Sequence, residues 1–301
     1  MARKIIDLTT QHPGWIGDQF PVAFAKVNDN FEELYARGGA NMLINCGLPI
    51  NQRGFAGGAL AAGAYGYDRW KAGAGGCSVT INATTGVFTH AGGPLQQVVE
   101  TPHMAWGQPL TVSVEDPSGP VAVSVGGTTG SIPAGTGRVG VTLTPSGSGD
   151  MVLQLTAAGV TYSRPKLERG NVATAFVPLQ PQAELALCQR YYEKSYAVGV
   201  APGTATRSGC HVSSALTGYL LSAPLVRFAV AKRTTPAVTL FNTQNGAAGQ
   251  LSENGGDGLH TYNKPAAVDS VGTGSFEVFV SNGTASPGNI ERVQWTADAE
   301  L

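Results

Sequence analysis

The chain has 301 residues, of which only 13% are charged, and it contains 41 glycines and 18 prolines. Charged side chains make up about a quarter of a typical globular protein, and a helical bundle needs them on its surface. An apolar share of 42% still allows a hydrophobic core, which argues against a disordered chain. Because glycine adopts positive φ angles without steric cost, this composition favours many short strands joined by tight turns.

The charge balance limits the partners that the chain can bind. The 19 basic and 20 acidic residues give a net charge of −1, with no basic run, so we expect no nucleic-acid binding. No stretch of about 18 apolar residues occurs, so we expect no membrane span. The first residues, MARKIIDLTTQ, lack the apolar run of a signal peptide, so we expect no secretion through a signal peptide.

The cysteines predict neither a metal site nor a cofactor. There are 4 of them, and they show no CxxC pair and no Cys/His spacing of the kind that binds zinc. We expect all of them to be free, buried thiols in a reducing compartment. A disulfide between Cys188 and Cys210 is the alternative.

Residues 1–40 differ from the rest of the chain and predict a helix. Pro21 is acceptable in the first turn of that helix, and Gly38-Gly39 suits its end. Apolar residues recur at the spacing of an amphipathic helix or a coiled-coil seam. These seam residues are Phe20, Phe24, Val27, Phe31 and Leu34. Because the segment has no strands of its own to cover this stripe, we predict that the stripe faces another chain or another subunit.

Strand patterns dominate residues 41–179 and predict a first β unit. Apolar residues alternate with small or polar ones at 112–114, 121–125, 139–143 and 151–155. This period of two buries one face of each strand. Turn sequences such as DPSG and PSGSGD separate the segments at the spacing of about 8–12 residues that is typical of a sandwich.

Residues 180–195 break the strand pattern, and residues 196–301 return to it. Leu185, Cys188 and Tyr192 share one helical face, so we predict a short connector helix over 180–195. After the connector, strand patterns occur at 225–230, 237–241, 275–280 and 292–295. They predict a second all-β unit of about 100 residues, within the usual size of a domain.

A search for catalytic motifs finds none. The sequence lacks GxSxG, HExxH and GxxxxGK[ST], and its G-x-G-x-x-G match at 135–140 runs on into a strand where a nucleotide site needs a helix. The carboxylates of the first β unit, including Glu100, Glu115 and Glu168, show no pairing that predicts glycoside hydrolysis. We therefore predict no catalytic residues.

Aromatic residues are stronger candidates for ligand contact. Sugars stack their apolar faces on aromatic rings, while amide or guanidinium groups bind their hydroxyls. Residues of these types occur near turns of the first β unit, whereas we interpret Trp70 and Trp295 as core residues. The candidate ligand contacts are Tyr65, Tyr67, Arg69 and Trp106.

Several sequence strings resemble the tail fibres and tail proteins of tailed bacteriophages. KVNDNFEELYA (26–36) resembles their N-terminal virion-attachment helix. NMLINCGLPINQRG with YGYDRWKAG (41–73) resembles the opening of a jelly-roll domain like a carbohydrate-binding module, and LERGNVATAFVP (167–178) resembles its closing strand. ELALCQRYYEKS (184–195) is similar to the connector that follows, and ERVQWTADAEL (291–301) to the last strand of the fibre tip domain.

The resemblance implies a fold and an organisation for the whole chain. The fold is mainly β, with an N-terminal helix, a jelly-roll β-sandwich, a short connector helix and a β-sandwich-like C-terminal tip domain. The implied boundaries are 1–40 for the virion-attachment segment, 41–179 for the jelly roll, 180–195 for the connector and 196–301 for the tip. Many related modules hold a structural calcium ion in the jelly roll, and the sequence leaves that question open.

The resemblance also implies a function. The chain is expected to be a non-catalytic virion protein, a homotrimer made in the host cytoplasm. Its N-terminus would bind other tail proteins, and its β units would bind a glycan or a protein receptor on the host surface. Two alternatives stay open, namely a tail-associated polysaccharide depolymerase and a purely structural tail-tip or baseplate component.

Overall fold

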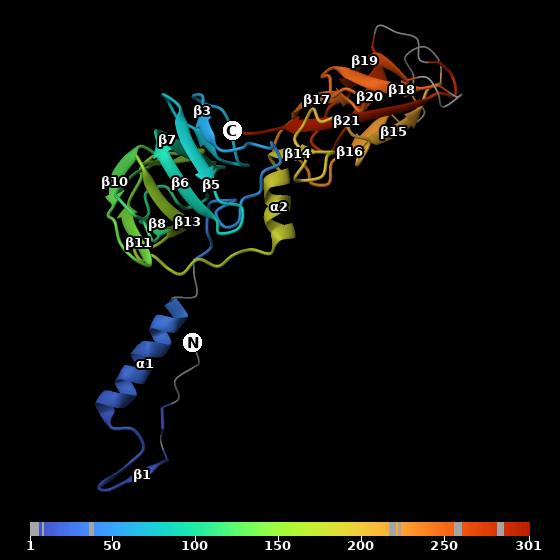
Figure 1. The fold of residues 1–301 in the computed structure, drawn as a ribbon. Helices are drawn as coiled ribbons and strands as arrows, with labels where there is room; N and C mark the ends of the chain where they lie inside the picture. The colour runs from blue at the N-terminus through green and yellow to red at the C-terminus, as the bar shows by residue number, and fades with distance from the viewer. Residues whose placement is uncertain are drawn as a thin grey trace.

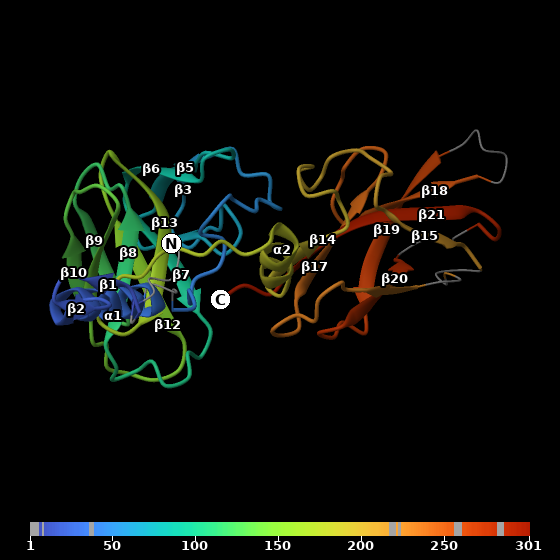
Figure 2. The ribbon, with the colours of Figure 1, turned by 90° about the horizontal axis from the view of Figure 1, so that it is seen from below.

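Short strands make up most of the regular structure of the chain. The computed structural model describes residues 6–7, 9–35, 39–216, 221, 224–255, 261–281 and 286–301. Strands far outnumber helices in these residues, which confirms the predicted mainly β class. Figures 1 and 2 show two β units side by side, with the N-terminal helix at one end of the first unit.

The N-terminal segment contains a small hairpin followed by the predicted helix. β1 (Gln11–His12) pairs with β2 (Trp15–Ile16), and α1 spans Phe20–Tyr35. In Figure 1, α1 lies below the first β unit and on the opposite side from the second one. The helix therefore projects from the β units.

The first β unit is a sandwich of antiparallel sheets. One sheet has the strand order β10-β9-β12-β7-β4, and the other has the order β11-β8-β13-β6-β5-β3. The strands are β3 (Gly58–Leu60), β4 (Lys71–Ala72), β5 (Cys77–Ile81), β6 (Val87–Gly92), β7 (Pro94–Val99), β8 (Leu110–Glu115), β9 (Val121–Val125), β10 (Thr128–Ile132), β11 (Arg138–Leu143), β12 (Met151–Thr156) and β13 (Val160–Arg169). This arrangement agrees with the predicted jelly-roll sandwich.

The core of this unit follows the predicted alternation. Val121, Val123 and Val125 are buried on β9, whereas Ala122 between them is exposed. Trp70 is fully buried, with its ring edge-on to a neighbouring phenylalanine at 5.7 Å between centroids. The interpretation of Trp70 as a core residue is therefore confirmed.

The connector differs from its prediction in one respect. α2 covers only Pro181–Gln189, and Tyr192–Lys194 form a strand, β14, that pairs with the last strand of the chain. The prediction of one helix over 180–195 is thus wrong at its C-terminal end. The helical spacing of Tyr192 is real, but long-range strand pairing and burial decide its conformation.

The second β unit is built around its last strand, β21 (Ile290–Asp298). Residues 296–298 pair with both β14 and β17, and residues 290–292 pair with both β15 and β18, so β21 is central along its length. Trp295 is buried there, as predicted. The other strands are β15 (His211–Ser214), β16 (Leu225–Arg227), β17 (Ala237–Asn242), β18 (Gln250–Asn254), β19 (Thr261–Asp269) and β20 (Ser275–Val280).

Two further expectations concern membrane-spanning helices and the state of the cysteines in the described residues. None of their helices is long and apolar enough to cross a membrane. Cys46, Cys77 and Cys188 are free and buried, while Cys210 is free and half-buried. The alternative of a disulfide between Cys188 and Cys210 is therefore wrong.

A pair of buried carboxyl groups lies between β18 and β21. Glu253 and Glu291 face each other in the strand register and are almost fully buried. The Glu253 carboxylate accepts hydrogen bonds from Ser286 N at 3.1 Å and Asn289 Nδ2 at 3.0 Å. No hydrogen-bond donor reaches the Glu291 oxygens in the described part of the chain. Burial and the neighbouring Glu253 raise the pKa of Glu291 from 4.5 to about 9.

This raised pKa predicts how the stability of the second β unit depends on pH. The stability that protonated Glu291 contributes is complete below its ordinary pKa of 4.5 and is lost as pH rises through about 9. We expect the free energy of unfolding to fall across that interval by at most about 1.4 kcal/mol per pH unit. Urea unfolding at several pH values measures it, with Glu291→Gln expected to remove this fall. Glu277→Gln on β20 serves as the control and should keep it; an unchanged pH profile in Glu291→Gln would contradict the assignment.

Candidate functional site

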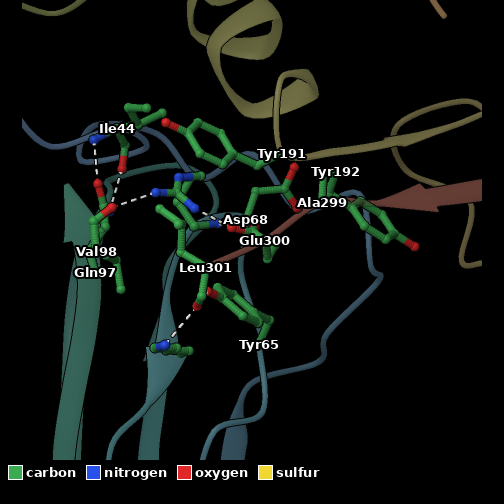
Figure 3. Close-up of polar contacts among 12 residues, drawn as sticks. Ile44, Tyr65, Asp68, Gln97, Val98, Tyr191, Tyr192, Ala299, Glu300 and Leu301 are labelled. Carbon is green, nitrogen blue, oxygen red and sulfur yellow. Dashed lines mark hydrogen bonds and ion pairs between the residues drawn. The ribbon is translucent and has the colours of Figure 1, made fainter. Parts of the chain in front are cut away.

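The last residues of the chain bind to the first β unit. After β21 ends at Asp298, residues 299–301 continue onto the jelly roll, beside which Figure 1 marks the C-terminus. The main-chain oxygen of Leu301 accepts hydrogen bonds from Tyr65 Oη at 2.5 Å and Lys71 Nζ at 2.7 Å (Figure 3). We call residues 298–301, together with the jelly-roll side chains that they contact, the unit junction.

Arg69 is the most deeply buried cation of the unit junction, with 1% exposure. Its guanidinium forms an ion pair with the Glu300 carboxylate and donates a hydrogen bond to Val98 O at 2.6 Å. The guanidinium carbon also lies 3.5 Å from the ring centroid of Tyr191, within cation–π distance. Burial raises the pKa of Glu300, and the nearby guanidinium groups oppose that rise.

Arg53 adds a second cation to the junction. It forms an ion pair with Asp298 at 2.9 Å and approaches Glu300 at 3.7 Å. Its guanidinium carbon stands 3.7 Å from the ring centroid of Tyr192. Two arginines of the jelly roll therefore stack on two consecutive tyrosines of the second unit and bind the acidic end of β21.

Further polar bonds surround these arginines. Gln52 Nε2 donates to the buried carboxylate of Asp68 at 2.6 Å and to Tyr192 O at 2.6 Å, so it links the two units. Burial raises the pKa of Asp68 to about 6. On the other side of the junction, Tyr191 Oη donates to Glu100 at 2.9 Å, and Arg190 forms an ion pair with the same carboxylate at 3.0 Å.

Three of the predicted ligand contacts are taken up by the protein's own residues, Tyr67 in the sandwich core and Tyr65 and Arg69 in the unit junction. Tyr67 is 4% exposed, with its ring edge-on to Phe55 and its hydroxyl accepting from Ile81 N at 2.9 Å. Arg69 and Tyr65 are engaged with residues 300–301. The prediction that Tyr67 and Arg69 contact a ligand is wrong for this conformation, because neither side chain has a free surface.

Trp106 is the predicted contact that lies at the surface. It sits in the loop 100–109 between β7 and β8 and is half-buried. A cavity of about 520 Å³ opens beside it. Sequence reasoning missed most of the wall of this cavity, which is lined by Met104, Trp106, Gln108, Pro109, Arg169 and Gly170.

The predicted seam of α1 is open to solvent in the single chain. Phe20 is 75% exposed and Phe24 is 53% exposed, and their rings contact each other at 4.4 Å between centroids. Val27 is half-buried. The side chains of Phe31 and Leu34 lie outside the described residues.

The carboxylates named for the enzyme alternative are all engaged by cations. Glu100 pairs with Arg190, and Glu115 pairs with two arginines. Glu168 is fully buried and pairs with Lys166 at 2.9 Å. Among the described residues, no group of three or more His, Cys, Asp or Glu side chains gathers in a way that suits a metal ion.

Comparisons with known proteins add little to this geometry. No protein-family model matches the chain, and no curated protein matches it. A structural search finds the cycloisomaltooligosaccharide glucanotransferase of Paenibacillus sp., crystallised with cycloisomaltoheptaose, at 12% identity and a TM-score of 0.23. The match covers 91% of this chain and 50% of that one, so the chain spans about half of that enzyme. A likeness at this TM-score carries no argument about fold or activity.

The junction predicts a large difference between two neighbouring acidic residues. Glu300→Ala leaves the buried Arg69 guanidinium without its carboxylate, so we expect the free energy of unfolding of the jelly-roll unit to fall by about 3 kcal/mol. Asp298→Ala removes a carboxylate whose side chain is 42% exposed, and should cost at most about 1 kcal/mol.

Urea unfolding followed by tryptophan fluorescence measures both variants. Asp298 serves as the matched control, because it also pairs with Arg53 and lies only two residues away. Equal decreases in the free energy of unfolding in the two variants would contradict the prediction that the ion pair of Arg69 with Glu300 contributes most to the junction.

Proposed function

We propose that the chain is a receptor-binding tail fibre or tail protein of a tailed bacteriophage, acting by non-catalytic attachment to the host surface. The observation that carries the proposal is the open apolar stripe of α1, in which Phe20 and Phe24 are exposed in the single chain. A helix of this length is marginally stable in water unless its apolar face is packed. The stripe therefore favours assembly, as expected for an attachment segment.

The arrangement of the β units supports the same function. The buried ion pair of Arg69 with Glu300 and the stacking of Arg53 on Tyr192 hold the second unit against the first. These contacts keep the second unit in one orientation relative to the first (Figure 1). Stiffness of this kind suits a protein that presents a binding surface away from its anchor.

Assembly through α1 would also determine the strength of attachment. In a homotrimer, three copies of each β unit face the host surface together. Weak contacts repeated around a symmetry axis give an avidity that exceeds any single contact. A modest site on each subunit is then sufficient for stable attachment.

The stripe predicts the oligomeric state. Phe24→Glu places a charge in the proposed seam and should convert a trimer of the full chain into monomers in sedimentation or light-scattering measurements. Ala25→Glu makes the same charge change at an exposed position of α1 outside the seam, and should leave the trimer intact. A monomeric wild-type chain, or equal effects of the two substitutions, would count against assembly through this stripe.

The attachment role itself is tested on phage particles and cells. Antibodies to the chain are expected to label tails, and the purified chain is expected to bind host cells and to reduce phage adsorption. A chain missing from purified virions would overturn the proposal. A chain that is present in virions without any effect on adsorption would replace it with the purely structural tail role. Release of reducing sugar from host polysaccharide by the pure chain would replace it with the depolymerase.

A further inference from the structure

Hydrogen bonds anchor the loop 100–109, which has an unusual backbone conformation. Thr101 N donates to the Asp150 carboxylate at 2.8 Å, and Gly107 N donates to Pro145 O at 2.8 Å. Two residues of the loop that are not glycine, Thr101 and Met104, have φ angles of +32° and +55°. Such backbone conformations are costly and gather at functional sites. The loop is therefore a strained segment that its surroundings keep in place.

Trp106 is fixed in one orientation by its neighbours. Its indole N–H donates to Gly149 O at 3.0 Å. Its ring rests against Gly126 and Gly147, and a Cβ atom at Gly147 would lie only 2.8 Å from a ring carbon. Both glycines also have positive φ angles, so side chains are disfavoured there for two reasons. The indole is thus positioned before any ligand arrives.

The cavity beside this indole has the size and chemistry of a ligand site. Its volume of about 520 Å³ lies within the range of about 300–1,000 Å³ that is usual for small-molecule pockets. Met104, at 84% exposure, extends an apolar thioether along one side. Gln108 supplies an exposed amide and Arg169 an exposed guanidinium. We call this cavity the Trp106 pocket.

Arg169 is the one charged residue that the structure describes in the lining of the pocket. Its guanidinium donates to His103 O, which ties it to the loop. Among the described residues it forms no ion pair with a carboxylate, although most other arginines of the jelly-roll unit do so. A guanidinium matches the geometry of a carboxylate and binds it through paired hydrogen bonds. The pocket therefore combines an aromatic platform with a cation available for an acidic group.

We propose that the Trp106 pocket binds an acidic saccharide, such as a hexuronic or sialic acid residue. The sugar ring would stack on the indole, its carboxylate would pair with Arg169, and its hydroxyls would bond to Gln108. The use of this site in host attachment rests on the function proposed above, whereas the binding itself does not. A neutral sugar leaves the guanidinium without an anionic partner, and a simple carboxylate leaves the indole without a stacked ring.

Ligand-observed NMR with the full chain tests the proposal. The probes are oligogalacturonate and N-acetylneuraminic acid, with neutral galacto-oligosaccharide and acetate as comparisons. We expect at least one acidic sugar to bind at least about tenfold more tightly than the neutral sugar and acetate. The neutral sugar lacks the carboxylate that pairs with Arg169, and acetate lacks the ring that stacks on Trp106. Comparable binding of the neutral sugar or of acetate, or no binding of any acidic sugar, overturns the proposal.

Two arginine substitutions distinguish binding at this pocket from a general effect of the positive charge of the protein. Arg169→Gln should weaken acidic-sugar binding at least about tenfold and leave neutral-sugar binding unchanged, since one charge-assisted pair is worth that much. Arg227→Gln makes the same charge change at an exposed position of β16 and should leave both unchanged. Thermal unfolding of both variants checks that the loop and the fold are intact. Equal weakening by the two substitutions overturns the site.

The outcomes also separate this proposal from the attachment role. Host cells that bind Arg169→Gln as well as the wild-type chain show that the pocket is not the receptor site, and leave the tail-fibre role standing. Acidic-sugar binding by a chain that is missing from virions supports the pocket and overturns the tail-fibre role. The two proposals can therefore fail independently.

Discussion

The ion pair between Arg69 and Glu300 is the contact on which the arrangement of the two β units depends. Both groups are almost completely buried, and they lie 231 positions apart in the chain. A buried guanidinium without a carboxylate costs several kcal/mol, so the pair mainly restricts how the two β units can be arranged. It can form only when residues 299–301 extend from β21 in a single register. Because β21 is also the central strand of the second unit, its pairing and the unit junction are determined together.

Local patterns in the sequence predicted the elements whose formation depends on local physics. The alternating valines of β9 predict a strand with one buried face, and such a strand forms. The interpretation of Trp70 and Trp295 as core residues is confirmed, since both are buried. By contrast, Tyr192 has helical spacing but lies in β14, because pairing with β21 and stacking on Arg53 outweigh a local preference. The residues that outweigh the local preference lie more than a hundred positions away in the chain, so no window of the sequence contains them.

The same reasoning explains which parts of the candidate site were predicted. Tyr65, Tyr67 and Arg69 are of types that bind ligands, but Tyr67 is buried in the sandwich core and Tyr65 and Arg69 contact the chain's own residues 300–301. Trp106 is predicted from its residue type and its place near a loop, and it lies beside a surface cavity. Arg169 was missed because it enters the cavity from the end of β13. Its pairing opposite Leu110 brings it to the loop, and a correct strand register would have been the signal.

The low charge content of the chain is lower still on its surface. Several charged side chains are buried and serve the interior, as Lys166, Glu193 and Lys232 do. The exposed surface is therefore poorer in charge than the sequence suggests. On such a surface, an exposed guanidinium that forms no ion pair has a strong local effect, because few neighbouring charges offset it. The scarcity of charge thus favours Arg169 as the group that selects acidic ligands. The indole of Trp106 beside it favours ligands with a ring that can stack.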